Sequence, residues 1–233
     1  MLENILRSGF SEMMLSVPDN AGEFFRTYYE LLREKNAVMN LTAISGEEDT
    51  ARLHFLDSLS PLLLFDMAGR SVIDVGTGAG FPGLPLKIAC PLLDLTLLDS
   101  QNKRVEFLSE VCHQLGLSGV ECIHQRAEDC GERRESYDFA VSRAVARLNV
   151  LCELCLPYVK LGGAFLALKG PALSEELSEA QKAIAILGGK VERVFDYAIP
   201  GVEARHNIAV IRKVSPTPKK YPRRFALIKK SPL

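Results

Sequence analysis

Residues 71 to 83 constrain the fold more than any other stretch, because they join a short apolar segment to a glycine-rich turn. Ser71 to Val75 has the length and character of a buried strand. Gly76, Gly78 and Gly80 follow it directly, and glycine adopts positive φ readily and leaves no Cβ between the backbone and a ligand. The stretch therefore predicts an α/β domain whose loop receives a ligand, with a plain tight strand-to-helix turn as the alternative.

The pattern changes along the chain from helices alone to strands that alternate with helices. Residues 2 to 66 read as helices, whereas strands are predicted near 71–75, 94–98, 119–124, 137–142 and 163–168, with helices near 82–90, 101–116, 147–160 and 173–187. Two further strand-like segments, 190–198 and 207–214, are too close for a parallel crossover and predict an antiparallel hairpin.

This order of elements predicts an α/β fold of the class I S-adenosylmethionine (SAM)-dependent methyltransferase type, which is Rossmann-like. A mostly parallel sheet that ends in an antiparallel hairpin is the plan of that class, whereas a dinucleotide-binding dehydrogenase continues in parallel. We expect a helical N-terminal extension over residues 1–66, the SAM-binding domain over 67–214 and a basic C-terminal tail over 215–233.

Acidic residues stand at two of the predicted strand ends, where doubly wound sheets bind their ligands. Asp74 can accept hydrogen bonds from loop amides or, through water, from the ammonium group of the methionine part of SAM. Asp99 ends the second strand and can accept both hydroxyls of a ribose, with a solvated helix N-cap as the alternative. Gly76, Gly78 and Phe81 complete this cofactor site, with Phe81 shielding its apolar side.

The later strand ends add a second group of candidate residues. Ala127 and Glu128 follow the third strand, where the adenine would lie, and Arg143 and Lys169 end the fourth and fifth strands. A solvated position is the alternative for Glu128 and Lys169. Arg143 differs, because an arginine flanked by apolar residues needs a partner or an open cleft.

Two other motifs give weaker evidence of function than the strand ends do. Residues 78–83 match the G-x-G-x-x-G pattern of dinucleotide-binding proteins, but the match begins two residues late, after a glycine that already ends the strand. Cys152 and Cys155 have the spacing of a metal pair, but they lie in an apolar helical segment with no second pair nearby. The histidines have no metal-ligand spacing, and we therefore predict reduced core thiols and no metal site.

Charge divides the chain unevenly. Residues 204–233 contain nine basic residues and no acid, while the preceding 203 residues contain 19 basic and 29 acidic residues. A basic end on an acidic body favours a polyanionic partner, with a solvated tail as the alternative. Lys219, Lys220, Arg223 and Arg224 are the predicted RNA-binding residues. No apolar run approaches the length of a membrane span and the first residues do not form a secretory signal, so we expect a cytoplasmic monomer.

Several short elements of the sequence are distinctive as a set. They are Asn40-Leu41-Thr42, His54-Phe55-Leu56-Asp57-Ser58-Leu59, residues 74–83, Ala127-Glu128, Ser142-Arg143-Ala144, Leu168-Lys169-Gly170 and Tyr221-Pro222-Arg223-Arg224. On these residues the chain resembles, over nearly its whole length, the bacterial glucose-inhibited division protein B family, which is the small-subunit ribosomal RNA methyltransferase G family.

The resemblance implies methyl transfer from SAM to N7 of one guanosine in 16S ribosomal RNA, with that RNA or the small ribosomal subunit as partner. It also implies that the cofactor is contacted by Gly76, Phe81, Ala127, Glu128 and Arg143. Guanine N7 presents a free lone pair, so no general base is expected, and Arg143 and Lys169 are expected to hold the base or a phosphate. A nicotinamide-dependent oxidoreductase and a non-catalytic ribosome-assembly factor are the rival interpretations.

Overall fold

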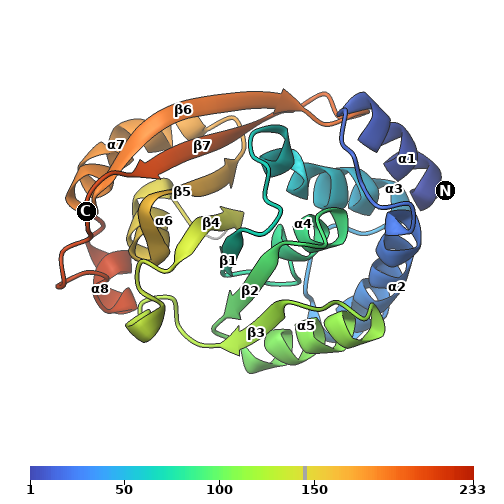
Figure 1. Cartoon of the computed structure of the whole chain (residues 1–233), viewed down its shortest axis with the longest axis horizontal. Helices are drawn as coiled ribbons and strands as arrows, with labels where there is room; N and C mark the ends of the chain where they lie inside the picture. The colour runs from blue at the N-terminus through green and yellow to red at the C-terminus, as the bar shows by residue number, and fades with distance from the viewer. Residues whose placement is uncertain (144–145) are drawn as a thin grey trace.

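The computed structural model describes residues 1–143 and 146–233. Within them, seven strands form one sheet in the order β3-β2-β1-β4-β5-β7-β6 (Figure 1). The strands are β1 (Ser71–Val75), β2 (Asp94–Asp99), β3 (Val120–His124), β4 (Tyr137–Arg143), β5 (Val159–Lys169), β6 (Gly189–Ala198) and β7 (Arg205–Lys213). Strands β1 to β5 pair in parallel, and β7 is antiparallel to both β5 and β6. The predicted sheet with its antiparallel hairpin is confirmed.

Helices cover both faces of the sheet. One face is covered by α4 (Gly83–Ala89) and α5 (Asn102–Gln114), and the other by α6 (Leu148–Cys155), the 3₁₀ turn Leu156–Tyr158 and α7 (Leu173–Ile186). A further 3₁₀ turn, Gly131–Arg133, precedes β4. The central strands are mostly apolar because they are buried from both sides, and the buried acids Asp74 and Asp99 stand at or near their carboxyl ends. The six cysteines are all free, and three of them are buried among apolar side chains.

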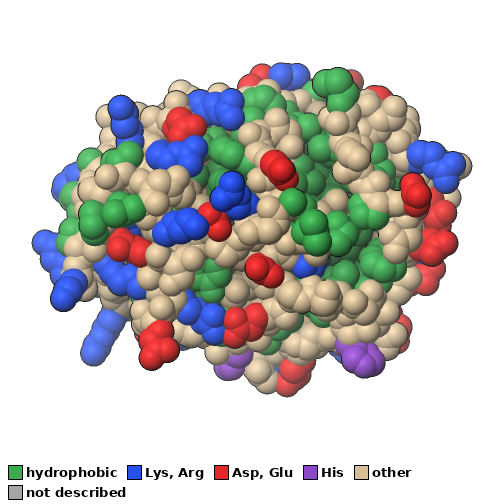
Figure 2. All heavy atoms as spheres, in the orientation of Figure 1, with side chains coloured by type: hydrophobic (Ala, Val, Ile, Leu, Met, Phe, Trp, Pro, Cys, Tyr) green, Lys and Arg blue, Asp and Glu red, His purple; other side chains and the backbone are tan. Residues whose placement is uncertain are grey.

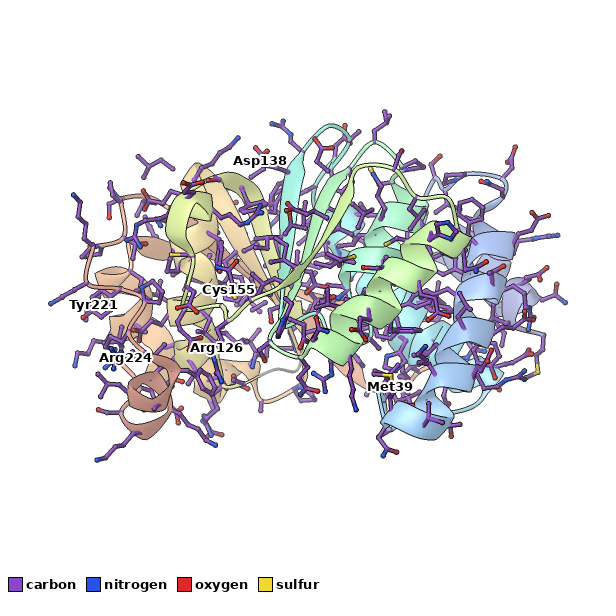
Figure 3. The ribbon with its side chains drawn as sticks, turned by 90° about the horizontal axis from the view of Figure 1, so that it is seen from below. Met39, Arg126, Asp138, Cys155, Tyr221 and Arg224 are labelled. Atoms are coloured by element: carbon purple, nitrogen blue, oxygen red, sulfur yellow. The ribbon has the colours of Figure 1, made fainter. Side chains whose placement is uncertain are left out.

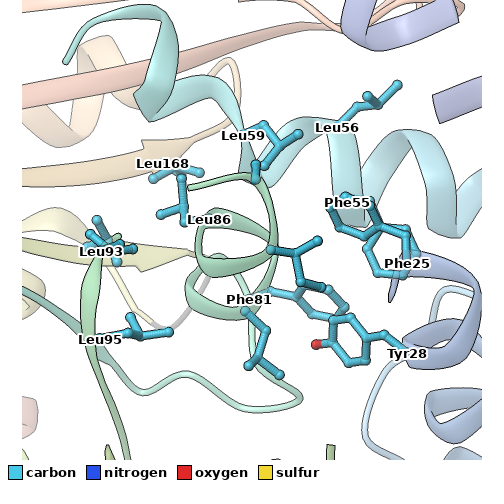
Figure 4. Close-up of a cluster of buried hydrophobic side chains, with 14 of the residues drawn as sticks. Phe25, Tyr28, Phe55, Leu56, Leu59, Phe81, Leu86, Leu93, Leu95 and Leu168 are labelled. Carbon is cyan, nitrogen blue, oxygen red and sulfur yellow. The ribbon is translucent and has the colours of Figure 1, made fainter. Parts of the chain in front are cut away.

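The N-terminal residues form an additional helical layer outside α4 and α5. It consists of α1 (Leu2–Glu12), α2 (Ala21–Met39), α3 (Glu47–Asp49), a π-helix (Thr50–Leu56) and a 3₁₀ turn (Ser60–Leu63). The loop between β1 and α4, residues 76–82, is called the glycine loop below. Aromatic side chains pack this layer against it: Phe25 packs on Phe55, and Tyr28 stacks on Phe81 with centroids 5.5 Å apart (Figure 4). The layer therefore shares one core with the sheet.

Residues 215–233, the C-terminal segment, are packed against the domain along much of their length. Tyr221 and Ile228 are buried, and Arg134 donates hydrogen bonds to the carbonyls of Thr217, Pro218 and Tyr221. The segment ends in the short helix α8 (Phe225–Lys230), which lies against α6. No helix in the described ranges is both long and apolar enough to cross a membrane.

Candidate functional site

A cavity of about 450 Å³ lies at the carboxyl ends of β1, β2 and β4. Arg126, which lines it, and Asp138, at the start of β4, lie at opposite edges of the sheet in Figure 3. The residues that line the cavity come from the glycine loop, the strand ends, the N-terminal layer, α6 and α8. These residues are Leu41, Thr42, His54, Val75, Gly76, Thr77, Gly78, Ala79, Phe81, Leu98, Asp99, Ser100, Arg104, Gln125, Arg126, Ala127, Glu128, Arg143, Leu151, Leu154 and Phe225.

The glycine loop has the conformation that its sequence predicts. Gly76 and Gly78 have φ values of 73° and 62°, and a Cβ at Gly78 would meet no atom within 4 Å. The open space beside Gly78 belongs to the cavity, since this glycine lines it. The backbone here can therefore approach a ligand closely.

Asp74, in β1, accepts hydrogen bonds at both ends of the glycine loop and does not line the cavity. Its Oδ2 accepts hydrogen bonds from the Thr77 hydroxyl (2.7 Å) and the Gly83 amide (2.8 Å), while its Oδ1 has no partner among the described residues. Burial raises the pKa of this carboxyl to about 7, although both hydrogen bonds oppose the rise. Asp74 therefore accepts a loop amide, as one of its two predicted roles requires.

Asp99 joins the loop to one end of the cavity. Its Oδ2 accepts from the Gly78 amide at 3.0 Å and its Oδ1 from the Gln101 amide at 2.9 Å. Arg104 approaches the same carboxylate at 3.4 Å. The carboxylate is 3% exposed, yet it lines the cavity, and Oδ1, which accepts one hydrogen bond, retains a free lone pair for a hydroxyl donor.

Ala127 and Glu128 form the wall beyond Asp99, as expected from their place after β3. The Ala127 carbonyl accepts from the Tyr158 hydroxyl, which fixes the backbone at this point. Glu128 accepts from the backbone amide of Phe225, and both residues line the cavity. This end of the cavity is therefore closed by the C-terminal segment.

Arg143 is the centre of a second polar cluster, at the other end of the cavity. One of its nitrogens, Nη1, lies 2.9 Å from Asp57 Oδ2 and 2.9 Å from the carbonyl oxygen of Leu53 in the π-helix. Tyr197 and His206 also contact the Asp57 carboxylate. Burial opposes ionisation of Asp57, but these partners outweigh it and lower the pKa of the carboxyl. The partner that the sequence requires for Arg143 is therefore Asp57. Ala144, the next residue of that motif, lies outside the described residues.

His54 extends this cluster to the cavity wall. Its Nδ1 lies 2.8 Å from Arg143 Nη2 and its Nε2 lies 2.7 Å from Thr42 Oγ1. Its ring stacks on Phe81 with centroids 4.2 Å apart and planes 10° apart. Burial, and next the Arg143 charge, lower the pKa of His54 to about 3, so the ring is neutral.

Two of the predicted site residues are engaged elsewhere. Lys169 does not line the cavity: its ammonium donates to the Ala146 carbonyl (2.6 Å) and to Glu176 of α7 (2.7 Å). The expectation that Lys169 reaches the base is therefore not supported. Arg223 forms a bidentate pair with Glu153, whose carboxylate is fully buried.

Most lining residues were not among the predicted site residues, and those with side chains that bear on the site's chemistry include Thr42, His54, Arg104 and Phe225. Thr42 and His54 stand in the distinctive elements of the sequence, but nothing in their spacing predicts that His54 bonds to both Thr42 and Arg143. A π-helix carries His54, and such helices occur frequently at functional sites, but no sequence signal identifies one.

Comparisons with solved structures confirm the fold. A SAM-dependent methyltransferase from Aquifex aeolicus superimposes with a TM-score of 0.53 at 20% identity, covering 70% of this chain and 92% of that one. TrmN from Thermus thermophilus gives a TM-score of 0.54 at 19% identity, covering 68% of this chain and 48% of that one.

Comparisons of sequence identify the family. The ribosomal RNA small subunit methyltransferase G of Alkaliphilus metalliredigens is 50% identical, covering 98% of both chains. The protein of the same name from Staphylococcus carnosus is 48% identical, covering 94% of this chain and 93% of that one. A family model described as rRNA small subunit methyltransferase G matches residues 22–206. The chain therefore belongs to the rRNA small subunit methyltransferase G family.

Proposed function

We propose that this protein transfers the methyl group of SAM to N7 of a guanosine in 16S ribosomal RNA. The observation that carries the proposal is the division of one cavity into two ends. One end presents the Asp99 carboxylate beside the glycine loop, while the histidine at the other end has both ring nitrogens engaged. The first end suits a cofactor with a ribose, and the second suits an acceptor that needs no deprotonation.

The residues at the first end fit SAM. Asp99 retains acceptor capacity at Oδ1 for a ribose hydroxyl, Gly78 leaves the backbone open toward the methionine part, and Gly76 lines the same cavity. Ala127, Glu128 and Phe225 would hold the adenine, since they close the wall beyond Asp99. When bound, SAM supplies an electrophilic methyl group and a neutral thioether leaving group.

The second end favours a nucleophile that already carries a lone pair. His54 is neutral, and its two nitrogens are bound to Arg143 and Thr42, so it cannot accept a proton from a substrate. Guanine N7 needs no such proton transfer, because its lone pair is free in the neutral base. The protein then has mainly to orient the base and exclude water.

We assign Arg143 a positioning role. Its guanidinium lies over the Phe81 ring, 5.0 Å from the centroid, and its hydrogen bonds to Asp57 and His54 fix the wall beside the base. Its side chain is 13% exposed and lines the cavity, so a contact with cofactor or base is also open to it. Lys169 has no part in this mechanism, because its ammonium is bound to Glu176.

Cations of the C-terminal segment provide a surface for the RNA backbone. Lys and Arg side chains gather on the side of the molecule where α8 and the C-terminus lie (Figures 1 and 2). Lys219, Lys220 and Arg224 are exposed and form no ion pair with any described residue. Arg224 and Arg126, a cavity residue, lie on the same side of the molecule (Figure 3). RNA bound here would therefore pass close to the cavity.

Methylation mapped at nucleotide resolution tests the proposal. Purified protein is given labelled SAM and small subunits, or their RNA, from cells that lack the gene, and N7-methylguanosine is located by chemical cleavage at that base. We expect one guanosine to become sensitive to cleavage. Labelling of another atom, or none with either substrate, would overturn the proposal. A parallel titration with SAM and NAD separates the methyltransferase from an oxidoreductase. Gel filtration and cell fractionation test the predicted cytoplasmic monomer.

A further inference from the structure

The hydrogen bonds around His54 can be assigned a single direction. Arginine nitrogens only donate, so Arg143 Nη2 donates to Nδ1 of His54. A neutral imidazole then carries its hydrogen on Nε2, and the low pKa of His54 keeps the ring neutral. Nε2 is therefore the donor to Thr42 Oγ1 at 2.7 Å. The tautomer is thus set by Arg143.

The Thr42 oxygen receives a second hydrogen bond, from the Ile44 amide at 3.1 Å. A hydroxyl oxygen has two lone pairs, and both are now occupied by donors. Its own hydrogen has no acceptor among the described residues. Thr42 in this structure can therefore donate one more hydrogen bond but cannot accept one.

Thr42 is also held firmly in place against the cavity. Asn36 of α2 accepts from the Thr42 amide (2.8 Å) and donates to the Thr42 carbonyl (3.0 Å). Asn40 ends α2 in the left-handed conformation, at φ 50°, which turns the chain back toward Asn36. The hydroxyl thus projects from a fixed backbone in the wall of the cavity that also contains His54 and Phe81.

We propose that Thr42 recognises the target base by donating its hydroxyl hydrogen to O6 of guanine. This inference rests on the proposed function, and it deepens that function by naming what selects the base. Guanine presents an acceptor at C6, whereas adenine presents an amino donor there. A free hydroxyl would accept from that amino group, but the Thr42 oxygen has no lone pair left for it.

The contact serves selection and positioning, and it does not accelerate the chemistry. A donor at O6 withdraws electron density from the base and so slightly weakens N7 as a nucleophile. In return, it holds the Hoogsteen edge while leaving the N7 lone pair without a hydrogen bond. The rings of His54 and Phe81 stack on each other in the same part of the cavity, and they form a closely packed wall beside the base.

The test pairs variants of Thr42 with analogues of the base. RNA substrates carry either guanine or 2-aminopurine at the methylated position; 2-aminopurine keeps N7 and the 2-amino group but lacks O6. With guanine, Thr42→Val should lower kcat/KM by about ten- to a hundredfold, because O6 then lies unpaired in the cavity. With 2-aminopurine, the loss in Thr42→Val should be much smaller, because only the acceptor of His54 Nε2 and the Ile44 amide is then removed. Thr42→Ser keeps the hydroxyl and should restore most of the activity on guanine.

Controls separate recognition from folding. Ser45→Ala removes an exposed hydroxyl from the same loop and should change neither substrate's kcat/KM. SAM affinity by calorimetry should stay the same in Thr42→Val. Equal losses on guanine and 2-aminopurine, or no loss on guanine, would overturn the role of Thr42 while leaving the proposed function intact. If the parent methylates no guanine at N7, the proposed function itself fails.

Discussion

The two ends of the cavity are built in different ways. The end at Asp99 is assembled from short segments that follow β1, β2 and β3, so the register of parallel strands alone brings most of it together. The end at His54 needs the N-terminal layer, because the π-helix contacts Arg143 across about 90 residues of sequence and Thr42 bonds to His54. The first end is therefore a property of the sheet, and the second is a property of its covering layer.

Because the two ends are built differently, they should contribute differently to the free energy of unfolding. Asp99 mostly orders a loop, whereas the Arg143 cluster joins the N-terminal layer to the sheet through Asp57 and through Tyr197 of β6. Disruption of the first end should affect ligand binding, and disruption of the second should affect folding as well. Four variants, ordered by expected effect, test how the parts of the molecule differ.

Arg143→Ala should have the largest effect. It leaves the Asp57 carboxylate buried, at 6% side-chain exposure, without its cationic partner. Loss of one member of a buried ion pair costs about 3–5 kcal/mol, so the free energy of unfolding in urea should fall by that amount. Arg147→Ala is the matched control, since its ion pairs are more than 40% exposed and should contribute no more than about 1 kcal/mol. Equal losses in the two variants would contradict the structural role of Arg143.

Asp74→Asn should change how stability depends on pH. The pKa of Asp74 is about 7 in the folded chain, compared with about 3.9 for an unperturbed aspartate. Between these values the folded state binds more protons, so the parent's free energy of unfolding should fall as pH rises from 4 to 7 and level off above.

Because asparagine does not titrate, Asp74→Asn should not show this fall in the free energy of unfolding with pH. In the parent the fall reaches about 1.4 kcal/mol per pH unit at its steepest. Urea unfolding at several pH values measures it. Asp138→Asn is the control of opposite sign: burial raises the pKa of Asp138, but Lys160 and Ser71 outweigh it and lower the pKa. In the parent, ionisation of Asp138 raises the free energy of unfolding as pH rises to about 4, and Asp138→Asn should lack this increase. Parallel pH profiles for the parent and Asp74→Asn would contradict the prediction.

Asp99→Ala should weaken SAM binding by about ten- to a hundredfold. Charge-assisted hydrogen bonds contribute about 1.5–3 kcal/mol each, and water replaces part of the two that a ribose would make. The Gly78 amide also loses its acceptor, which loosens the loop. Calorimetry measures the affinity. Arg104→Ala removes the neighbouring cation but no acceptor and should cost less. Unchanged affinity in Asp99→Ala would remove Asp99 from the site.

Replacement of Lys219, Lys220 and Arg224 by Gln should have the smallest effect at low salt. If all three contact phosphates, the slope of log affinity against log salt for RNA should flatten by about two to three units. Arg223→Gln is the control: it should lower stability, because Glu153 is fully buried, and leave the slope nearly unchanged. An unchanged slope in the triple variant would show that the RNA lies elsewhere.

The sequence predicts the sheet and the Asp99 end well because both depend on local patterns. Alternating apolar segments fix the strands, and a residue at the end of a parallel strand lies at the ligand edge whatever the rest of the chain does. The His54 end depends instead on how one layer packs on another. Nothing in the sequence indicates that His54 bonds to both Arg143 and Thr42, and the salt bridge of Lys169 with Glu176 is equally hidden.

The placement of Phe225 has a consequence for synthesis of the protein. Phe225 lines the cavity, so its wall is completed by a residue that is synthesised after the last strand of the sheet. A nascent chain that ends after β7 would contain every strand and the glycine loop, but Glu128 and Glu153 would lack their partners from the C-terminal segment. The wall beside Glu128 is therefore the last part of the cavity to be completed during synthesis.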